Sequence, residues 1–85
     1  MKHILSYQTK IGTFYIGKSE DNHYHPIFNN IDLGSYVNMW EATRDLSINA
    51  TNGVLHPETN EVVDTSTLGI PEDYIEWTRE VSARR

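Results

Sequence analysis

The clearest periodic pattern of apolar positions lies near the middle of the chain. Four residues recur at i, i+3, i+4 and i+7, which places them on one side of a helix: Met39, Ala42, Thr43 and Leu46. Asn38 and Glu41 have the spacing of a capping box, and Asn49 suits a left-handed stop. We therefore predict a helix over residues 38–48. Trp40 either widens its buried stripe or stands at the edge.

Upstream of this helix, β-branched and aromatic residues alternate with polar ones, which is typical of strands. We expect strands over residues 3–8, 12–17, 23–28 and 33–36, joined by short turns. Pro26 has no N–H to give to a ladder, so its nitrogen should face outward or sit at a bulge. The predicted fold class is α+β: an antiparallel β-meander of three to four strands packed against one main α-helix, with a short C-terminal helical segment.

The pattern after the helix is weaker. Two apolar runs flank a turn within residues 50–63, which fits either a small hairpin or an irregular loop. The polar stretch from Asp64 to Thr67 predicts a turn in which side chains bond the local backbone. Pro71 favours the start of a short helix that ends near Trp77.

Residues 68–77 hold five large apolar side chains, enough to form an exposed patch that monomers seldom tolerate: Leu68, Ile70, Tyr74, Ile75 and Trp77. We expect this segment to dock on the sheet. The side of the sheet bearing Tyr15 or Ile27 would need such a lid, because the main helix can cover only one face. Residues 1–81 are then one compact domain, and residues 82–85 a frayed tail.

Composition narrows the possible functions. The chain has 85 residues, 38% of them hydrophobic and 22% charged, with no cysteine and a net charge of −5. These values fit one folded domain without a disulfide, a thiolate nucleophile or a cysteine-based zinc site. No apolar run approaches the ~20 residues of a membrane span, so we expect a cytoplasmic protein without a membrane partner. Lysine and arginine are scattered, which argues against a phosphate-binding surface.

Three groups of residues resemble the recurring motifs of a family of short, uncharacterised bacterial proteins. They are Leu33-Gly34-Ser35-Tyr36, Asp45-Leu46, and the block from Asp64 to Asp73 with Glu76-Trp77. The likeness covers residues 12–77, although the family has a shorter link, containing glycine and histidine, between the helix and Asp64. No activity, cofactor or partner is attached to that family. The resemblance therefore implies one compact domain and adds nothing about chemistry.

Two patterns could carry catalysis or bind metal. Val62-Val63-Asp64-Thr65-Ser66 is similar to the signature of aspartic proteases, but the third signature position is serine instead of glycine, so a local turn capped by Asp64 is the simpler reading. His23 and His25 would share one face of a strand, with His3 on a neighbouring strand. Their spacing is not diagnostic of zinc, which takes three or four ligands. We expect neither a bound metal nor a cofactor.

Aromatic residues on the predicted sheet suggest an alternative. An open sheet face can stack single-stranded bases on such rings: Tyr7, Phe14, Tyr15, Tyr24 and Phe28. The acidic balance and the lack of a basic stripe argue against this reading, so nucleic-acid binding is the second choice.

The favoured function is a small protein-interaction or accessory domain, not an enzyme. Glu72, Asp73 and Glu76 should form an outward acidic ridge beside Tyr74, where a basic partner protein would land. A small metal-dependent or hydrolytic enzyme is the third possibility, because paired carboxylates can serve acid–base chemistry.

Overall fold

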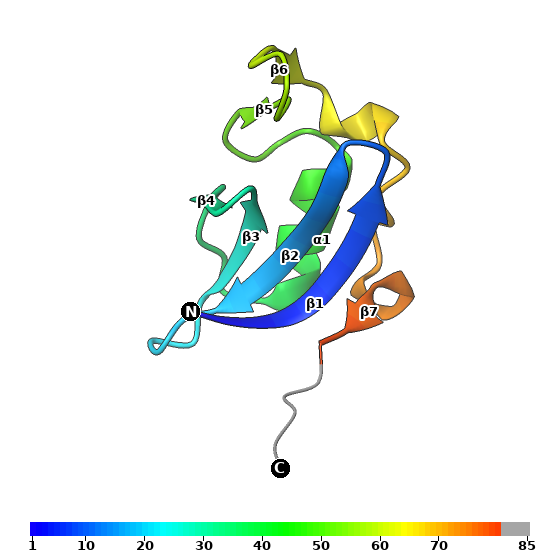
Figure 1. The fold of residues 1–85 in the computed structure, drawn as a ribbon. Coiled ribbons are helices and arrows are strands. Elements are labelled where there is room, and N and C mark those ends of the chain that lie inside the picture. Colours follow the sequence, from blue (N-terminus) through cyan, green and yellow to red (C-terminus); the bar gives the residue numbers. More distant parts are fainter. Residues whose placement is uncertain (81–85) are drawn as a thin grey trace.

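A twisted antiparallel sheet with one helix across its face forms the body of the protein (Figure 1). The computed structural model describes residues 1–80. Five strands make the sheet in the order β4-β3-β2-β1-β7: β1 (Lys2–Thr9), β2 (Gly12–Lys18), β3 (Tyr24–Phe28), β4 (Ile31–Asp32) and β7 (Thr78–Arg79). The helix is α1 (Met39–Ser47). The predicted α+β class is thus confirmed.

Alternation along the first three strands divides the sheet into a covered face and an open face. Leu5, Phe14 and Ile16 are buried on the covered face, whereas Tyr15 points the other way. Pro26 is paired with Ile16 in β2, and its carbonyl accepts from the Leu33 N–H at 2.8 Å on the opposite edge. Its nitrogen therefore faces away from β2, so the missing donor interrupts no β2–β3 bond.

The fourth strand differs from the predicted strand over residues 33–36. Asn29 and Asn30 both take positive φ, 54° and 65°, and close a two-residue hairpin directly after β3. The strand that follows is therefore Ile31–Asp32, and Leu33 leaves the sheet to enter the core at 2% exposure. Only Tyr36 of the predicted stretch makes a bridge, to Tyr24.

Helix α1 begins and ends as its sequence predicts. The Asn38 side chain accepts from the Glu41 N–H at 3.0 Å, which is one of the two bonds of a capping box. Asn49 takes φ 61°, and the chain turns away there. Trp40 is 48% exposed and so stands at the edge of the buried stripe. Within residues 1–80, no helix combines the length and the apolar character needed to cross a membrane.

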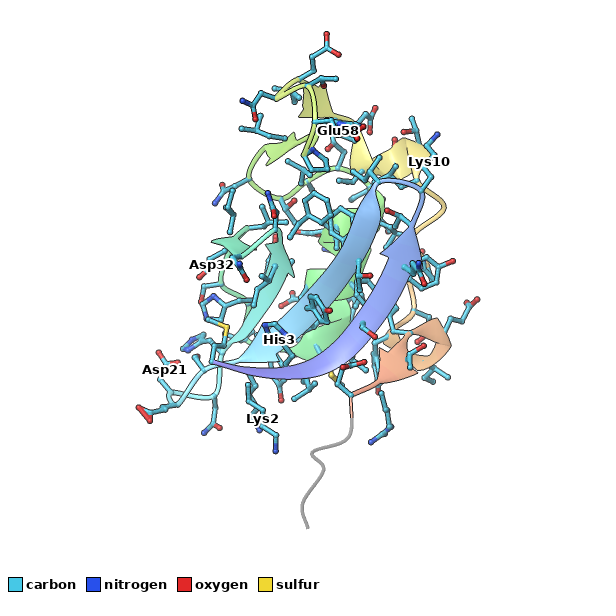
Figure 2. All side chains as sticks on the ribbon, in the orientation of Figure 1. Lys2, His3, Lys10, Asp21, Asp32 and Glu58 are labelled. Atoms are coloured by element: carbon cyan, nitrogen blue, oxygen red, sulfur yellow. The ribbon has the colours of Figure 1, made fainter. Side chains whose placement is uncertain are left out.

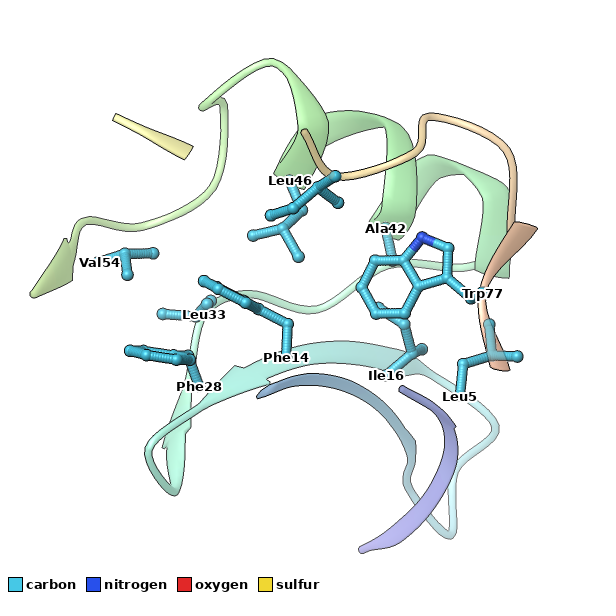
Figure 3. Close-up of a cluster of buried hydrophobic side chains, with 10 residues drawn as sticks. Leu5, Phe14, Ile16, Phe28, Leu33, Ala42, Leu46, Val54 and Trp77 are labelled. Carbon is cyan, nitrogen blue, oxygen red and sulfur yellow. The ribbon is translucent and has the colours of Figure 1, made fainter. Parts of the chain in front are cut away.

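One cluster of buried side chains lies between the sheet and α1 (Figure 3). The rings of Phe14 and Phe28 stack at 4.3 Å, with Phe14 lying under Leu46 of the helix and Trp77 under Ala42. Val54 closes one end, because β5 (Val54–Leu55) and β6 (Val62–Val63) pair as a small hairpin. Of the two readings of residues 50–63, the hairpin is therefore the correct one.

The C-terminal segment docks on the sheet as predicted, but on the face that α1 already covers. Ile70 and Trp77 join the core cluster, with Trp77 5% exposed and 5.8 Å from the Tyr7 ring. The predicted lid over Ile27 is therefore wrong. Met1 and Ile27 instead crowd over Gly17, where a Cβ would lie 2.7 Å and 2.8 Å from them.

The predicted short helix after Pro71 is reduced to a single 3-10 turn, η2 (Tyr74–Glu76). A second 3-10 turn, η1 (Thr65–Thr67), lies upstream of it. Strand β7 follows at once and pairs with β1, so the chain has no room to propagate a helix. The predicted tail, residues 82–85, lies outside the described residues, as does residue 81.

Asn38→Ala should destabilise the protein by about 1 kcal/mol, because the Glu41 N–H loses its acceptor. Urea denaturation followed by circular dichroism measures the change. Asn52→Ala is the matched control, since the Asn52 side chain is exposed and caps no helix. Equal midpoints for the two variants would remove Asn38 from the capping role.

Trp77→Ala should cost roughly 3–5 kcal/mol, a large share of the stability of a domain of this size. Trp40→Ala tests the same residue type at an exposed position and should cost less than about 1 kcal/mol. Chemical denaturation of both variants compares the two directly. Similar losses would contradict the assignment of Trp77 to the core.

Candidate protein-interaction surface

Two buried threonine hydroxyls hold the C-terminal segment along α1. Thr43 is fully buried, and its Oγ1 donates to the Glu72 carbonyl at 2.9 Å. Thr65, also fully buried, donates from Oγ1 to the carbonyl of Leu46. The segment therefore follows the helix from its C-terminal end toward its start, which brings η2 beside the first turn of α1.

Local bonds then shape η2. The Asp73 carboxylate accepts from the Ile75 N–H at 3.0 Å and caps the turn. The Trp77 indole N–H donates to the Pro71 carbonyl at 3.1 Å, closing the segment on itself. With Trp77 anchored in the core, Tyr74 packs against the core cluster, whereas Ile75 is 74% exposed and Glu76 is also exposed.

A shallow groove lies between α1 and this turn, with a volume of about 580 Å³. It is named the α1–η2 groove here, and six residues line it: Trp40, Glu72, Asp73, Tyr74, Ile75 and Glu76. All four partner-binding residues predicted from the sequence, Glu72, Asp73, Tyr74 and Glu76, therefore lie together in it. The sequence analysis missed Trp40 and Ile75, whose exposure depends on how the two elements pack.

The charge of the groove is acidic on one side only. Glu72, Asp73 and Glu76 are exposed and make no salt bridge within residues 1–80. On the helix side, the Arg44 guanidinium lies 5.1 Å from the centre of the Trp40 ring and 3.3 Å from an Asp45 oxygen. Arg44 is therefore already paired with a neighbouring carboxylate, and no cation within residues 1–80 compensates the three groove acids.

The aspartic-protease-like motif forms a turn, as the simpler reading predicts. Asp64 caps η1 by accepting from the N–H and the hydroxyl of Ser66, at 3.0 Å and 2.6 Å. The hydroxyl and backbone bonds from Ser66 lower the pKa of the Asp64 carboxyl. A shared-proton dyad raises one carboxyl pKa instead, so the local chemistry is that of a cap.

The histidines lie with separate partners. His23 is 3.2 Å from an Asp21 oxygen, and His25 is 2.9 Å from an Asp32 oxygen. His3 stacks on Tyr15 at 4.4 Å on the open sheet face (Figure 2). Among residues 1–80, no three metal-ligating side chains gather at one point.

The aromatic residues that suggested base stacking mostly serve the core. Phe14 and Phe28 are buried within it, and Tyr7 and Tyr24 pack against it. Tyr15 alone of the five lies on the open face, where His3 already covers one side of its ring. The five rings therefore do not form a common stacking platform.

Tyr36 lies in the loop that leads into α1. Burial, followed by the neighbouring Asp45 carboxylate, raises the pKa of its hydroxyl to about 12. The phenol therefore stays neutral in the physiological range and adds no charge beside the helix.

No protein-family model, curated protein or solved structure matches this chain. The resemblance to the short bacterial family therefore stays a prediction. The functional argument depends on the geometry described above.

Thr43→Val should destabilise the protein by about 1–3 kcal/mol, because the isosteric change leaves the Glu72 carbonyl without its donor. Amide hydrogen exchange should also accelerate across Tyr74–Glu76, since that bond fixes the segment to α1. Thr13→Val, on β2, is the control and should change stability by less than about 0.5 kcal/mol. Unchanged exchange in η2 would show that this bond does not position the groove.

Proposed function

We propose that this protein is a small interaction domain whose α1–η2 groove binds a basic, partly apolar segment of another protein. The observation that supports this most directly is that one groove combines two exposed apolar side chains with three carboxylates that have no salt bridge within residues 1–80. Trp40 is 48% exposed and Ile75 74% exposed. The binding role does not require catalysis, a metal or a cofactor.

The apolar part of the groove provides the binding energy. Tryptophan is among the residues that most often dominate interface energetics, and Ile75 lines the same groove from the middle of η2, which Asp73 caps. Because the Trp77 anchor and the Thr43 bond hold this turn in place, little ordering is needed when a partner binds.

The carboxylates favour a partner segment that carries positive charge. Lysine or arginine side chains flanking an apolar anchor would reach Glu72, Asp73 and Glu76, and an arginine could also lie against the Trp40 ring. Charge at the rim of an interface mainly raises the association rate, so binding should weaken with salt.

We also propose that the protein acts in the cytoplasm. A chain without cysteine gains no disulfide from an oxidising compartment, and three exposed carboxylates suit a basic protein partner there.

A labelled amphipathic peptide of lysine and leucine, read by fluorescence anisotropy, tests the groove. The triple variant E72Q/D73N/E76Q should weaken binding by about tenfold or more, since each lost charge contributes. Asparagine at position 73 retains the cap of η2, because asparagine and aspartate cap about equally well. Trp40→Ala should also weaken binding, although it leaves the charge of the groove unchanged.

The control removes the same number of charges elsewhere. E20Q/E58Q/E61Q changes three exposed carboxylates outside the groove and should alter affinity by about twofold at most. Equal weakening by both triple variants would mean that the peptide senses only net charge, and the groove would lose its assigned role.

A further inference from the structure

A second hollow lies on the other side of η2, and its chemistry is opposite to that of the groove. It has a volume of about 360 Å³, within the roughly 300–1,000 Å³ of ligand pockets, and is named the β1–η2 pocket here. Leu5, Met39 and Trp77 form its apolar interior. Among residues 1–80, the only charged residues that line it are Lys18 and Arg79, although the chain has 12 acidic residues against 7 basic ones.

The strand register places both cations on the covered face of the sheet. Arg79 is directly opposite Leu5 in the β1–β7 pair, so the two side chains share a face. Lys18 follows two residues after the fully buried Ile16, and strand alternation gives it the same face. The two charges therefore stand at the rim of an apolar interior.

A bulge in β1 contributes to the shape of the pocket. The pairing with β2 shifts between His3 and Leu5, which leaves Ile4 as the extra residue. As a result, the consecutive residues Ile4 and Leu5 both line the pocket. The Trp77 ring is fixed by its indole bond to the Pro71 carbonyl at 3.1 Å, so the apolar interior is preformed.

Neither cation is neutralised within residues 1–80. The described salt bridges join other residues, and Asp21, close to Lys18 in the chain, lies 3.2 Å from His23. Glu80, beside Arg79, accepts from the Ser6 hydroxyl at 2.7 Å. Lys18 Nζ lies 5.7 Å from the centre of the Tyr24 ring, an aromatic contact that leaves its charge available.

From these features we infer that the β1–η2 pocket binds a small carboxylate with an apolar body, such as a medium-chain fatty acid or an arylalkanoic acid. The apolar body would lie against Leu5, Met39 and Trp77. The carboxylate would face the Arg79 fork, which suits two parallel hydrogen bonds, with Lys18 as a second charge. This site is separate from the acidic groove and does not depend on the function proposed for it.

Octanoate is the probe, titrated into the full chain labelled with nitrogen-15. We expect saturable shifts of the Leu5 and Met39 amides and of the Trp77 indole N–H, with a Kd below about 1 mM. Octan-1-ol, which has the same tail without the charge, and acetate, which has the charge without the tail, should each bind at least about tenfold more weakly.

Variants separate the specific site from general hydrophobic binding. Lys18→Gln and Arg79→Gln should each weaken the binding of octanoate by about tenfold. Lys10→Gln, at the opposite end of the β1–β2 hairpin, should leave its affinity unchanged (Figure 2). The double variant K18E/R79E should instead favour octylammonium over octanoate, and thermal melts of each variant check that it folds.

The proposal is overturned if octanoate shifts no pocket resonance, or if octanol binds as tightly as octanoate. It is also overturned if the charge variants leave octanoate affinity unchanged. The groove variant E72Q/D73N/E76Q should retain octanoate binding, so failure at one site is distinguishable from failure at the other.

Discussion

The bond from the Thr43 hydroxyl to the Glu72 carbonyl ties the C-terminal segment to α1 just before η2, the turn that lines both hollows. It crosses from a fully buried helical side chain to a backbone group 29 residues further along the chain. The bond is partly shielded from water, so losing the donor would leave the Glu72 carbonyl incompletely satisfied and loosen the segment along α1. Thr65 makes a bond in the reverse sense near the C-terminal end of the helix, where its hydroxyl donates to the Leu46 carbonyl. Between these two points the chain carries Ile70 into the core and delivers Trp77 to the sheet.

Local patterns in the sequence predicted the elements that local physics governs. The helix with its Asn38 cap and Asn49 stop, and the three long strands, follow from side-chain periodicity and from residues suited to special backbone angles. The position of β4 was missed because Asn29-Asn30 was treated as part of a longer turn. Two consecutive asparagines with positive φ instead made the tightest hairpin. Strand β7 carries no apolar signal, and its pairing with β1 is decided by the Trp77 anchor.

The candidate surface was predictable in its charge but not in its shape. Glu72, Asp73 and Glu76 are charged side chains close after Pro71, so their exposure could be inferred from the sequence alone. Trp40 precedes them by more than 30 residues, and only the packing of η2 against α1 brings it to the same groove. The β1–η2 pocket was missed for the same reason, since Lys18 and Arg79 belong to opposite ends of the chain.

Turn η2 separates two hollows of opposite charge, because Tyr74 and Ile75 line both of them. The hollows are therefore adjacent, and a charge bound in one acts on the charges of the other to the extent that salt does not screen it. A carboxylate held by Lys18 and Arg79 would offset their positive field and strengthen the attraction of Glu72, Asp73 and Glu76 for a basic segment. Because binding free energies are linked reciprocally, a basic partner in the groove would favour the anion by the same factor. The layout of charge around one three-residue turn therefore fixes the sign of any coupling between the two hollows as positive.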